Sequence, residues 1–222
     1  MIQKISVIIG HEENKQGSVS YWGESEFSFN CRVAGFLQDM LNQYDIECFS
    51  FRKVGLNYSN IADFYKKVGV DLSIELHCNS YYKVARGLEC LMLEGASRET
   101  YLYADAITDY VSAAMDIKER HTTSKIVKTD GVYAIERHAR GAVCLKGVEK
   151  SCKHALLFEP CFWNTKNPDS EKLKRDNGYF YAQSLCSAIV KTFSIGEKTS
   201  KPVDEWIKQL ENVVASMKAS RG

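Results

Sequence analysis

The sequence has no strong excess of charge of either sign. Its 29 basic and 28 acidic side chains leave a formal net charge of +1, and the Lys and Arg residues are spread along the chain rather than gathered in one block. Nucleic acids and anionic membrane surfaces select proteins with concentrated positive charge. We therefore expect neither to be a partner of the protein as a whole.

Long apolar runs are also missing. No stretch of the sequence approaches the roughly 18 apolar residues of a membrane-spanning helix. The N-terminal run ISVII is too short for the core of a signal peptide, and no small-residue cleavage site follows it. We therefore expect synthesis in the cytoplasm without a signal peptide, and no stable insertion into a membrane.

The eight cysteines form no CxxC pair, so a cysteine-based zinc site has little support. Their spacing also matches no small disulfide framework. Several of them, such as Cys48, Cys90 and Cys161, lie inside apolar runs, where a free thiol packs as a small hydrophobic side chain. The pattern favours reduced thiols.

The length and composition suit one substantial domain, because 222 residues with 45% hydrophobic side chains can bury a single core. Alternating and helical apolar patterns predict strands at 5–9, 46–51, 70–76, 87–93 and 154–158, and helices from the Ser25 cap to Leu41 and at 60–69, 98–115 and 173–193. Loops or a short hairpin are expected over 116–153. The alternation predicts an α/β fold: a single domain with a mainly parallel, twisted sheet flanked by helices.

The C-terminal part of the sequence differs from this pattern. We assign residues 1–194 to the catalytic domain and residues 195–222 to a linker followed by an amphipathic helix, because Trp206, Leu210 and Val213 recur at helical spacing. Docking onto the catalytic domain or self-association through this helix is the expected role. Membrane targeting is less favoured, because the charges of the segment nearly cancel.

Four polar residues lie at or near the ends of apolar runs: His11, Glu26, His77 and Glu159. In open α/β sheets, ligands bind at the carboxyl ends of the strands, where three of these residues are expected; Glu26 is expected in the first turn of a helix. Two imidazoles and one carboxylate can hold a zinc ion with one position open for water. A further carboxylate can then move the protons of that water. The four residues predict a zinc hydrolase.

Other side chains compete for these roles. Glu24 lies two residues before Glu26, which could itself be only a favourable charge at a helix start. Glu75 and His77 face the same side of their strand, because side chains alternate along a strand. Glu75 therefore either orients a ligand or replaces one. The remaining histidines are expected to be surface or hydrogen-bonded structural residues: His121, His138 and His154.

Five motifs occur in an order that resembles the zinc-dependent N-acetylmuramoyl-L-alanine amidases of the Amidase_3 type, which cleave bacterial peptidoglycan. The resemblance covers about residues 4–193. The residues that carry it are Gly10-His11, Glu26 and Asn30 in ESEFSFN, His77 and Asn79 in DLSIELHCNS, Gly87-Leu88-Glu89, and Arg140-Gly141 with Leu145 and Glu159 of LLFEPCFWN. The chain departs from the family pattern where Glu12-Glu13-Asn14 replace glycines and where Glu75 stands in place of Ser.

The resemblance implies a phosphorylase/hydrolase-like fold and a zinc cofactor. It implies that His11, Glu26 and His77 hold the zinc ion and that Glu159 is the catalytic carboxylate for hydrolysis of the amide between N-acetylmuramic acid and L-alanine. Three further residues are candidates for orienting a ligand or contacting the peptidoglycan substrate: Glu75, Asn79 and Arg140.

Two biological settings follow from the resemblance. A leaderless, compact amidase suggests a phage endolysin that is made in the host cytoplasm and acts on the cell wall or periplasm. The alternative setting is a bacterial enzyme of cell-wall remodelling. A zinc carboxypeptidase acting on cell-wall peptides also stays open, because Arg137 or Arg140 could bind a terminal carboxylate.

Overall fold

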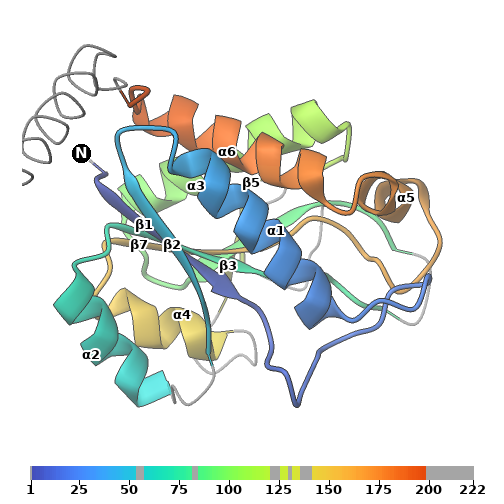
Figure 1. Ribbon diagram of the computed structural model, residues 1–222, viewed down its shortest axis with the longest axis horizontal. Coiled ribbons are helices and arrows are strands. Elements are labelled where there is room, and N and C mark those ends of the chain that lie inside the picture. Colours follow the sequence, from blue (N-terminus) through green and yellow to red (C-terminus); the bar gives the residue numbers. More distant parts are fainter. Residues whose placement is uncertain are drawn as a thin grey trace, which may run out of the picture.

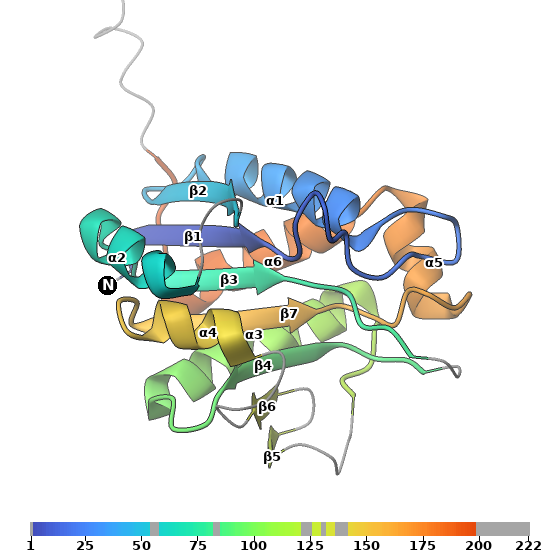
Figure 2. The ribbon, with the colours of Figure 1, turned by 90° about the horizontal axis from the view of Figure 1, so that it is seen from below.

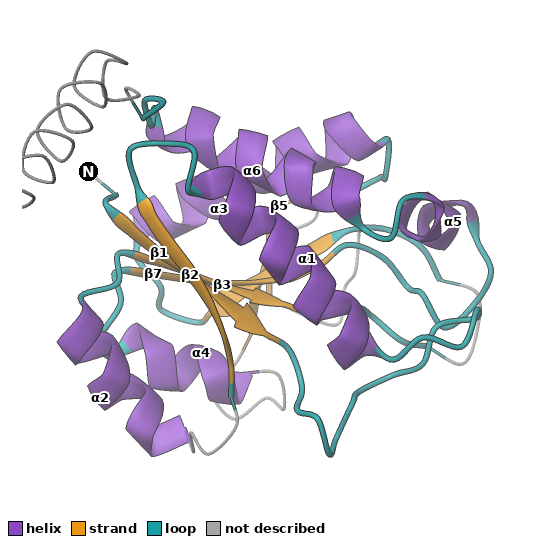
Figure 3. Cartoon of the chain, in the orientation of Figure 1, coloured by secondary structure: helices purple, strands orange, loops and turns teal. Residues whose placement is uncertain are grey.

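A seven-stranded sheet runs through the centre of the computed structural model, and helices cover both of its faces (Figures 1 and 3). The structure describes residues 2–53, 58–81, 85–120, 126–129, 132–135 and 142–198. The strands are β1 (Lys4–Ile9), β2 (Glu47–Arg52), β3 (Leu72–Leu76), β4 (Glu89–Leu93), β5 (Ile126–Thr129), β6 (Val132–Ile135) and β7 (His154–Glu159). The helices are α1 (Glu26–Leu41), α2 (Tyr58–Val68), α3 (Arg98–Met115), α4 (Ala142–Glu149), α5 (Pro168–Arg175) and α6 (Tyr179–Phe193).

The strands follow the order β2-β1-β3-β7-β4-β6-β5, which Figure 2 shows from one edge of the sheet to the other. Strands β2, β1, β3 and β7 run parallel to one another. Strand β4 is antiparallel to β7 and parallel to β6, and β5 and β6 form an antiparallel hairpin. The expected α/β fold with a mainly parallel sheet is therefore confirmed. From β1 the chain goes to β2 on one side and then returns to β3 on the other, so a topological switch point lies between β1 and β3.

Two hydrophobic clusters hold the layers together. The larger cluster joins one face of the sheet to α1, α3 and α6, and the smaller joins the other face to α2 and α4. Helix α1 begins where the sequence predicts, because the hydroxyl of Ser25 accepts a hydrogen bond from the backbone N–H of Ser28. Phe29, Val33 and Leu37 are fully buried, so this face of α1 is fixed against the sheet and Glu26 at its first turn is placed accurately.

Most predicted elements agree with the structure to within a few residues, and helix α3 matches its predicted bounds of 98–115. The single helix expected over 173–193 is wrong. Asn177 and Gly178 adopt left-handed backbone conformations, with φ of 57° and 83°, and divide the segment into α5 and α6. A Cβ atom at Gly178 would lie 2.7 Å from Val33 and 2.8 Å from Phe29, so the break also lets α1 approach closely.

The region expected to hold loops or a short hairpin does contain the β5–β6 hairpin, but it also contains helix α4, which was not predicted. His154 agrees with its expected structural role, because it is buried and its Nδ1 lies 2.8 Å from the hydroxyl of Thr100. His121 and His138 lie outside the described residues.

The seven cysteines whose side chains are described are free thiols. Among the described residues, no helix is long and apolar enough to cross a membrane. The amphipathic helix predicted in the C-terminal segment falls on residues 199–222, which lie outside the described residues.

Candidate metal and catalytic site

The carboxyl ends of β1 and β3 bring two histidines together. Ile9 pairs with Leu76 in the parallel register, and the N–H of Gly10 donates to the carbonyl of Leu76 over 3.0 Å. His77 follows β3 directly. His11 has a φ of 65°, and this left-handed turn takes the chain out of β1. The two imidazole rings lie 4.9 Å apart and nearly perpendicular.

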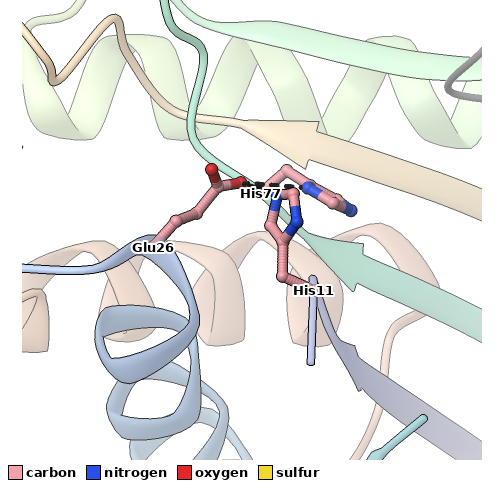
Figure 4. A group of neighbouring side chains, drawn as sticks. All are labelled: His11, Glu26 and His77. Carbon is pink, nitrogen blue, oxygen red and sulfur yellow. Dashed lines mark hydrogen bonds and ion pairs between the residues drawn. The ribbon is translucent and has the colours of Figure 1, made fainter. Parts of the chain in front are cut away.

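Glu26, at the first position of α1, points its carboxylate toward these two rings (Figure 4). Its Oε1 lies 3.0 Å from His11 Nε2 and 3.0 Å from His77 Nδ1, and accepts a hydrogen bond of 2.9 Å from the N–H of Cys78. Its Oε2 accepts hydrogen bonds from the N–H and hydroxyl of Ser18, over 3.1 and 2.7 Å. Only 2% of Glu26 is exposed, so these donors fix the carboxylate in one orientation.

The three side chains could hold a metal ion. One ligand atom from each of His11, Glu26 and His77 can be chosen so that all lie within 4.8 Å of one another. Two imidazole nitrogens and one carboxylate oxygen form a donor set that suits a divalent transition metal with a position left open. The residues present therefore fit a metal, and they are the three that the sequence analysis names as ligands.

Electrostatics within the cluster are strong. Burial disfavours the charged form of Glu26, but hydrogen bonds from His11 and His77 outweigh this effect and hold its pKa well below the usual range. Burial also disfavours the charged form of His77, which lowers its pKa, but hydrogen bonds to Glu26 and Glu75 outweigh this effect and raise the pKa to about 10. The raised pKa favours a proton on the His77 ring, which lies between the carboxylates of Glu26 and Glu75.

Two glycines leave the space that the cluster occupies. A Cβ atom at Gly10 would lie 2.1 Å from the carbonyl oxygen of Leu76 and 2.9 Å from the ring of His77. A Cβ atom at Gly17, whose φ is +77°, would lie 2.4 Å from Cδ2 of His11 and 2.8 Å from Oε2 of Glu26. Any larger residue at either position would displace a member of the cluster.

The two rival carboxylates occupy other places. Glu24 pairs with Arg32 and accepts a hydrogen bond of 3.1 Å from the indole of Trp22, and it is outside the three-residue cluster. Glu75 lies on the far side of the His77 ring from Glu26, with its Oε1 2.9 Å from His77 Nε2. The same oxygen accepts a hydrogen bond of 2.6 Å from Nζ of Lys53.

Glu159 is the last residue of β7 and is half-buried. Leu76 of β3 pairs with Phe158 of β7, and the N–H of His77 donates to the carbonyl of Phe158 over 2.9 Å. His77 and Glu159 are thus the next neighbours along two parallel strands. The structure therefore places Glu159 at the same sheet edge as the three-residue cluster.

The loops beyond β3 and β7 are tied to each other. The backbone of Asn79 forms hydrogen bonds with Cys161 and Trp163, and its side-chain amide donates to Glu89 over 3.0 Å. Phe162 and Trp163 are buried, so they belong to the core rather than to an exposed groove. Arg137 and Arg140 lie outside the described residues.

Three residues around the site were missed in the sequence analysis. Ser18 carries no recognisable local pattern, although its partner Glu26 is only eight residues away. Arg120 carries none either, and it pairs with Glu89 of a separate strand. Lys53 lies directly after β2 (Glu47–Arg52), as His77 lies directly after β3, but this position alone does not identify its partner.

The fold and the cluster together define an α/β protein whose potential metal-binding group lies at the carboxyl edge of a mainly parallel sheet. The family profile of Amidase_3, N-acetylmuramoyl-L-alanine amidase, matches residues 5–191, and the chain belongs to this family of amidases. A search of curated protein sequences gives no significant match.

Solved structures with similar folds are also amidases or lytic enzymes. An N-acetylmuramoyl-L-alanine amidase from Clostridium difficile is 16% identical with a TM-score of 0.70, covering 87% of this chain and 97% of that one. The catalytic domain of the amidase CwlV from Bacillus (Paenibacillus) polymyxa is 14% identical with a TM-score of 0.67, covering 87% and 99%. The catalytic domain of an endolysin targeting Clostridia difficile is 20% identical with a TM-score of 0.64, covering 85% and 97%. At these identities the likeness shows the shared fold.

Proposed function

We propose that this amidase is zinc-dependent and hydrolyses the amide bond between N-acetylmuramic acid and L-alanine in peptidoglycan. In this proposal, His11, Glu26 and His77 hold the zinc ion and Glu159 is the catalytic residue. The observation that carries the proposal is the convergence of His11 Nε2 and His77 Nδ1 on one oxygen of Glu26, each over 3.0 Å.

The chemistry divides between the metal and the protein. Zinc, when bound, lowers the pKa of water and polarises a carbonyl group. Glu159 takes a proton from the attacking water and delivers it to the nitrogen of L-alanine as the carbon–nitrogen bond breaks. Ser18 and the N–H of Cys78 hold Glu26 in a fixed orientation, so the ligand set is arranged before the substrate arrives.

We assign supporting roles to three further residues. Glu75 orients the His77 ring through its Nε2. Asn79 joins the loop after β3 to the loop after β7, and so helps to shape the substrate side of the site. Arg140 stays a prediction as a substrate contact.

For the biological setting we propose host lysis by a phage endolysin that acts on the cell wall or periplasm. The likeness to the catalytic domain of the endolysin targeting Clostridia difficile supports this setting. Remodelling of the cell wall by a bacterial enzyme is the alternative, and the likeness to the amidase of Clostridium difficile supports it equally.

Mass spectrometry of digested peptidoglycan tests the proposed reaction. Free stem peptides with L-alanine at their amino terminus are expected. Shortened stem peptides would instead identify a peptidase, and the absence of products would indicate a binding protein. The zinc content of the purified protein, compared with that of His77→Ala, tests the metal separately: the variant should lose zinc, while a zinc-free wild type would overturn the metal assignment.

A further inference from the structure

Lys53 and Glu75 form a buried ion pair behind His77. Lys53 follows β2 directly and Glu75 lies within β3, and the two residues are 7% and 2% exposed. Because β1 lies between β2 and β3, the Lys53 side chain spans β1 to bring its Nζ within 2.6 Å of Glu75 Oε1. A charged pair so deeply buried needs good geometry and further hydrogen bonds to be tolerated.

The further hydrogen bond connects this pair to His77. Oε1 of Glu75 lies 2.9 Å from His77 Nε2, while the other ring nitrogen, Nδ1, lies 3.0 Å from Glu26 Oε1. The two nitrogens of one ring thus face different carboxylates. Only the carboxylate on the Nε2 side is paired with the lysine.

We propose that Lys53 and Glu75 are positioning residues that select which nitrogen of His77 binds the metal. Glu75 accepts a hydrogen bond from the protonated Nε2, so the unprotonated Nδ1, which faces His11 and Glu26, is free to bind the metal. Lys53 holds Glu75 in place and balances its charge. This inference rests on the zinc site proposed above. It adds the buried cation Lys53 to the proposed zinc site, whose ligands and catalytic residue are histidines and carboxylates.

Charge balance gives Lys53 a specific purpose. A carboxylate that hydrogen-bonds a ligating histidine fixes its tautomer and makes the ring a stronger ligand. Here that carboxylate belongs to Glu75, which is the third carboxylate near the metal site after Glu26 and Glu159. With the Lys53 ammonium, the formal charges of a zinc ion and three carboxylates cancel; without it, one negative charge would remain in a buried region. A neutral site avoids that cost.

The test measures zinc affinity by competition with a chelator and compares Glu75→Gln with the double variant Lys53→Met/Glu75→Gln. Glu75→Gln should weaken zinc binding by about 10- to 100-fold, the usual effect of losing a residue that supports a metal ligand. It also leaves the Lys53 ammonium buried without its carboxylate and near the metal. Removing that ammonium in the double variant should therefore recover part of the lost affinity.

Two controls make the result specific. Lys4 of β1 forms an ion pair of 2.9 Å with Glu47 of β2, and both side chains are partly exposed. Lys4→Met should therefore leave zinc affinity unchanged. Nitrogen-15 NMR of zinc-loaded wild type should show a proton on Nε2 of His77. A metal on Nε2 of His77 would overturn the inference. So would a double variant, Lys53→Met/Glu75→Gln, that binds zinc no more tightly than Glu75→Gln.

The outcomes also separate this inference from the proposed function. If wild type binds zinc and Glu75→Gln binds it as tightly, the zinc site stands and the role of Lys53 and Glu75 is refuted. If wild type binds no zinc, both proposals fall together. The thermal stability of each variant, measured alongside, identifies any variant that loses zinc only because it unfolds.

Discussion

Glu89 and Glu159 lie directly opposite each other where β4 and β7 run antiparallel. Like charges in such cross-strand positions are destabilising. Glu89 is fully buried, pairs with the guanidinium of Arg120 and accepts a hydrogen bond from Asn79. Arg120 in turn lies over the ring of Phe162, 4.7 Å from its centroid. The proposed catalytic carboxylate thus has a neighbouring carboxylate whose charge is balanced.

Arg120→Met should destabilise the protein by removing this balance. Glu89 would stay buried opposite Glu159 without the guanidinium, and we expect a loss of about 2–3 kcal/mol in the free energy of unfolding, below the value for a fully buried pair because Arg120 is partly exposed. Urea denaturation measures the change. The double variant Arg120→Met/Glu89→Gln removes both charges and should recover part of the loss; equal instability of the two variants would contradict this explanation.

Glu159→Gln should separate catalysis from metal binding. The variant keeps the size of the side chain but cannot take a proton from water, so muropeptide release should fall by about 10²- to 10⁴-fold. Zinc content and melting temperature should stay at their wild-type values, because the cluster consists of His11, Glu26 and His77. Normal release of muropeptides by this variant would remove Glu159 from the mechanism.

The residues of the site could be predicted where local sequence fixes their place. His77 directly follows an apolar strand, and Glu26 follows the Ser25 cap, so strand ends and a helix start were readable without the fold. Lys53 and Arg120 were not singled out, because their roles depend on which distant strand or loop lies beside them. No local pattern shows that the side chain after β2 reaches Glu75 across β1.

The fold shows the same division. Apolar spacing over 173–193 predicts one helix, although Asn177-Gly178, the left-handed pair that follows α5, is a turn signal that this prediction overlooked. Helix α4 was missed because it is only 8 residues long and contains Gly147, a poor helix former. Periodicity reports which face is apolar but does not report where the chain turns.

Zinc binding should release a proton from His77. In the metal-free protein both ring nitrogens lie within 3.0 Å of carboxylate oxygens, and the pKa of His77 is raised to about 10. A metal on Nδ1 must displace the proton there, so at pH 8 we expect about two protons released per zinc ion, one from His77 and one from the zinc-bound water, and an apparent affinity that rises with pH up to about that pKa.

Calorimetric titration of zinc in two buffers with different ionisation enthalpies measures the number of protons released. Lys4→Met, remote from the ring, should release the same number as wild type. Release of only about one proton per zinc ion, the contribution of the bound water alone, would show that His77 is already neutral before zinc binds and would refute the coupling.

Gly17→Ala should abolish zinc binding through steric contact rather than through backbone strain. Its Cβ atom would lie 2.4 Å from Cδ2 and 2.6 Å from Nε2 of His11, so the imidazole would have to leave its position beside Glu26. The backbone contributes a second effect, because Gly17 has a φ of +77° and a side chain in this region costs about 1 kcal/mol.

Gly23→Ala separates the two effects. Gly23 has a φ of +90°, but a Cβ atom there would meet nothing within 4 Å. Gly23→Ala should therefore show a small loss of stability with normal zinc affinity, whereas Gly17→Ala should lose zinc at a comparable melting temperature. Chelator competition and thermal unfolding measure both quantities. If the two variants bind zinc alike, His11 does not depend on the space that Gly17 leaves, and its place in the ligand set would need another explanation.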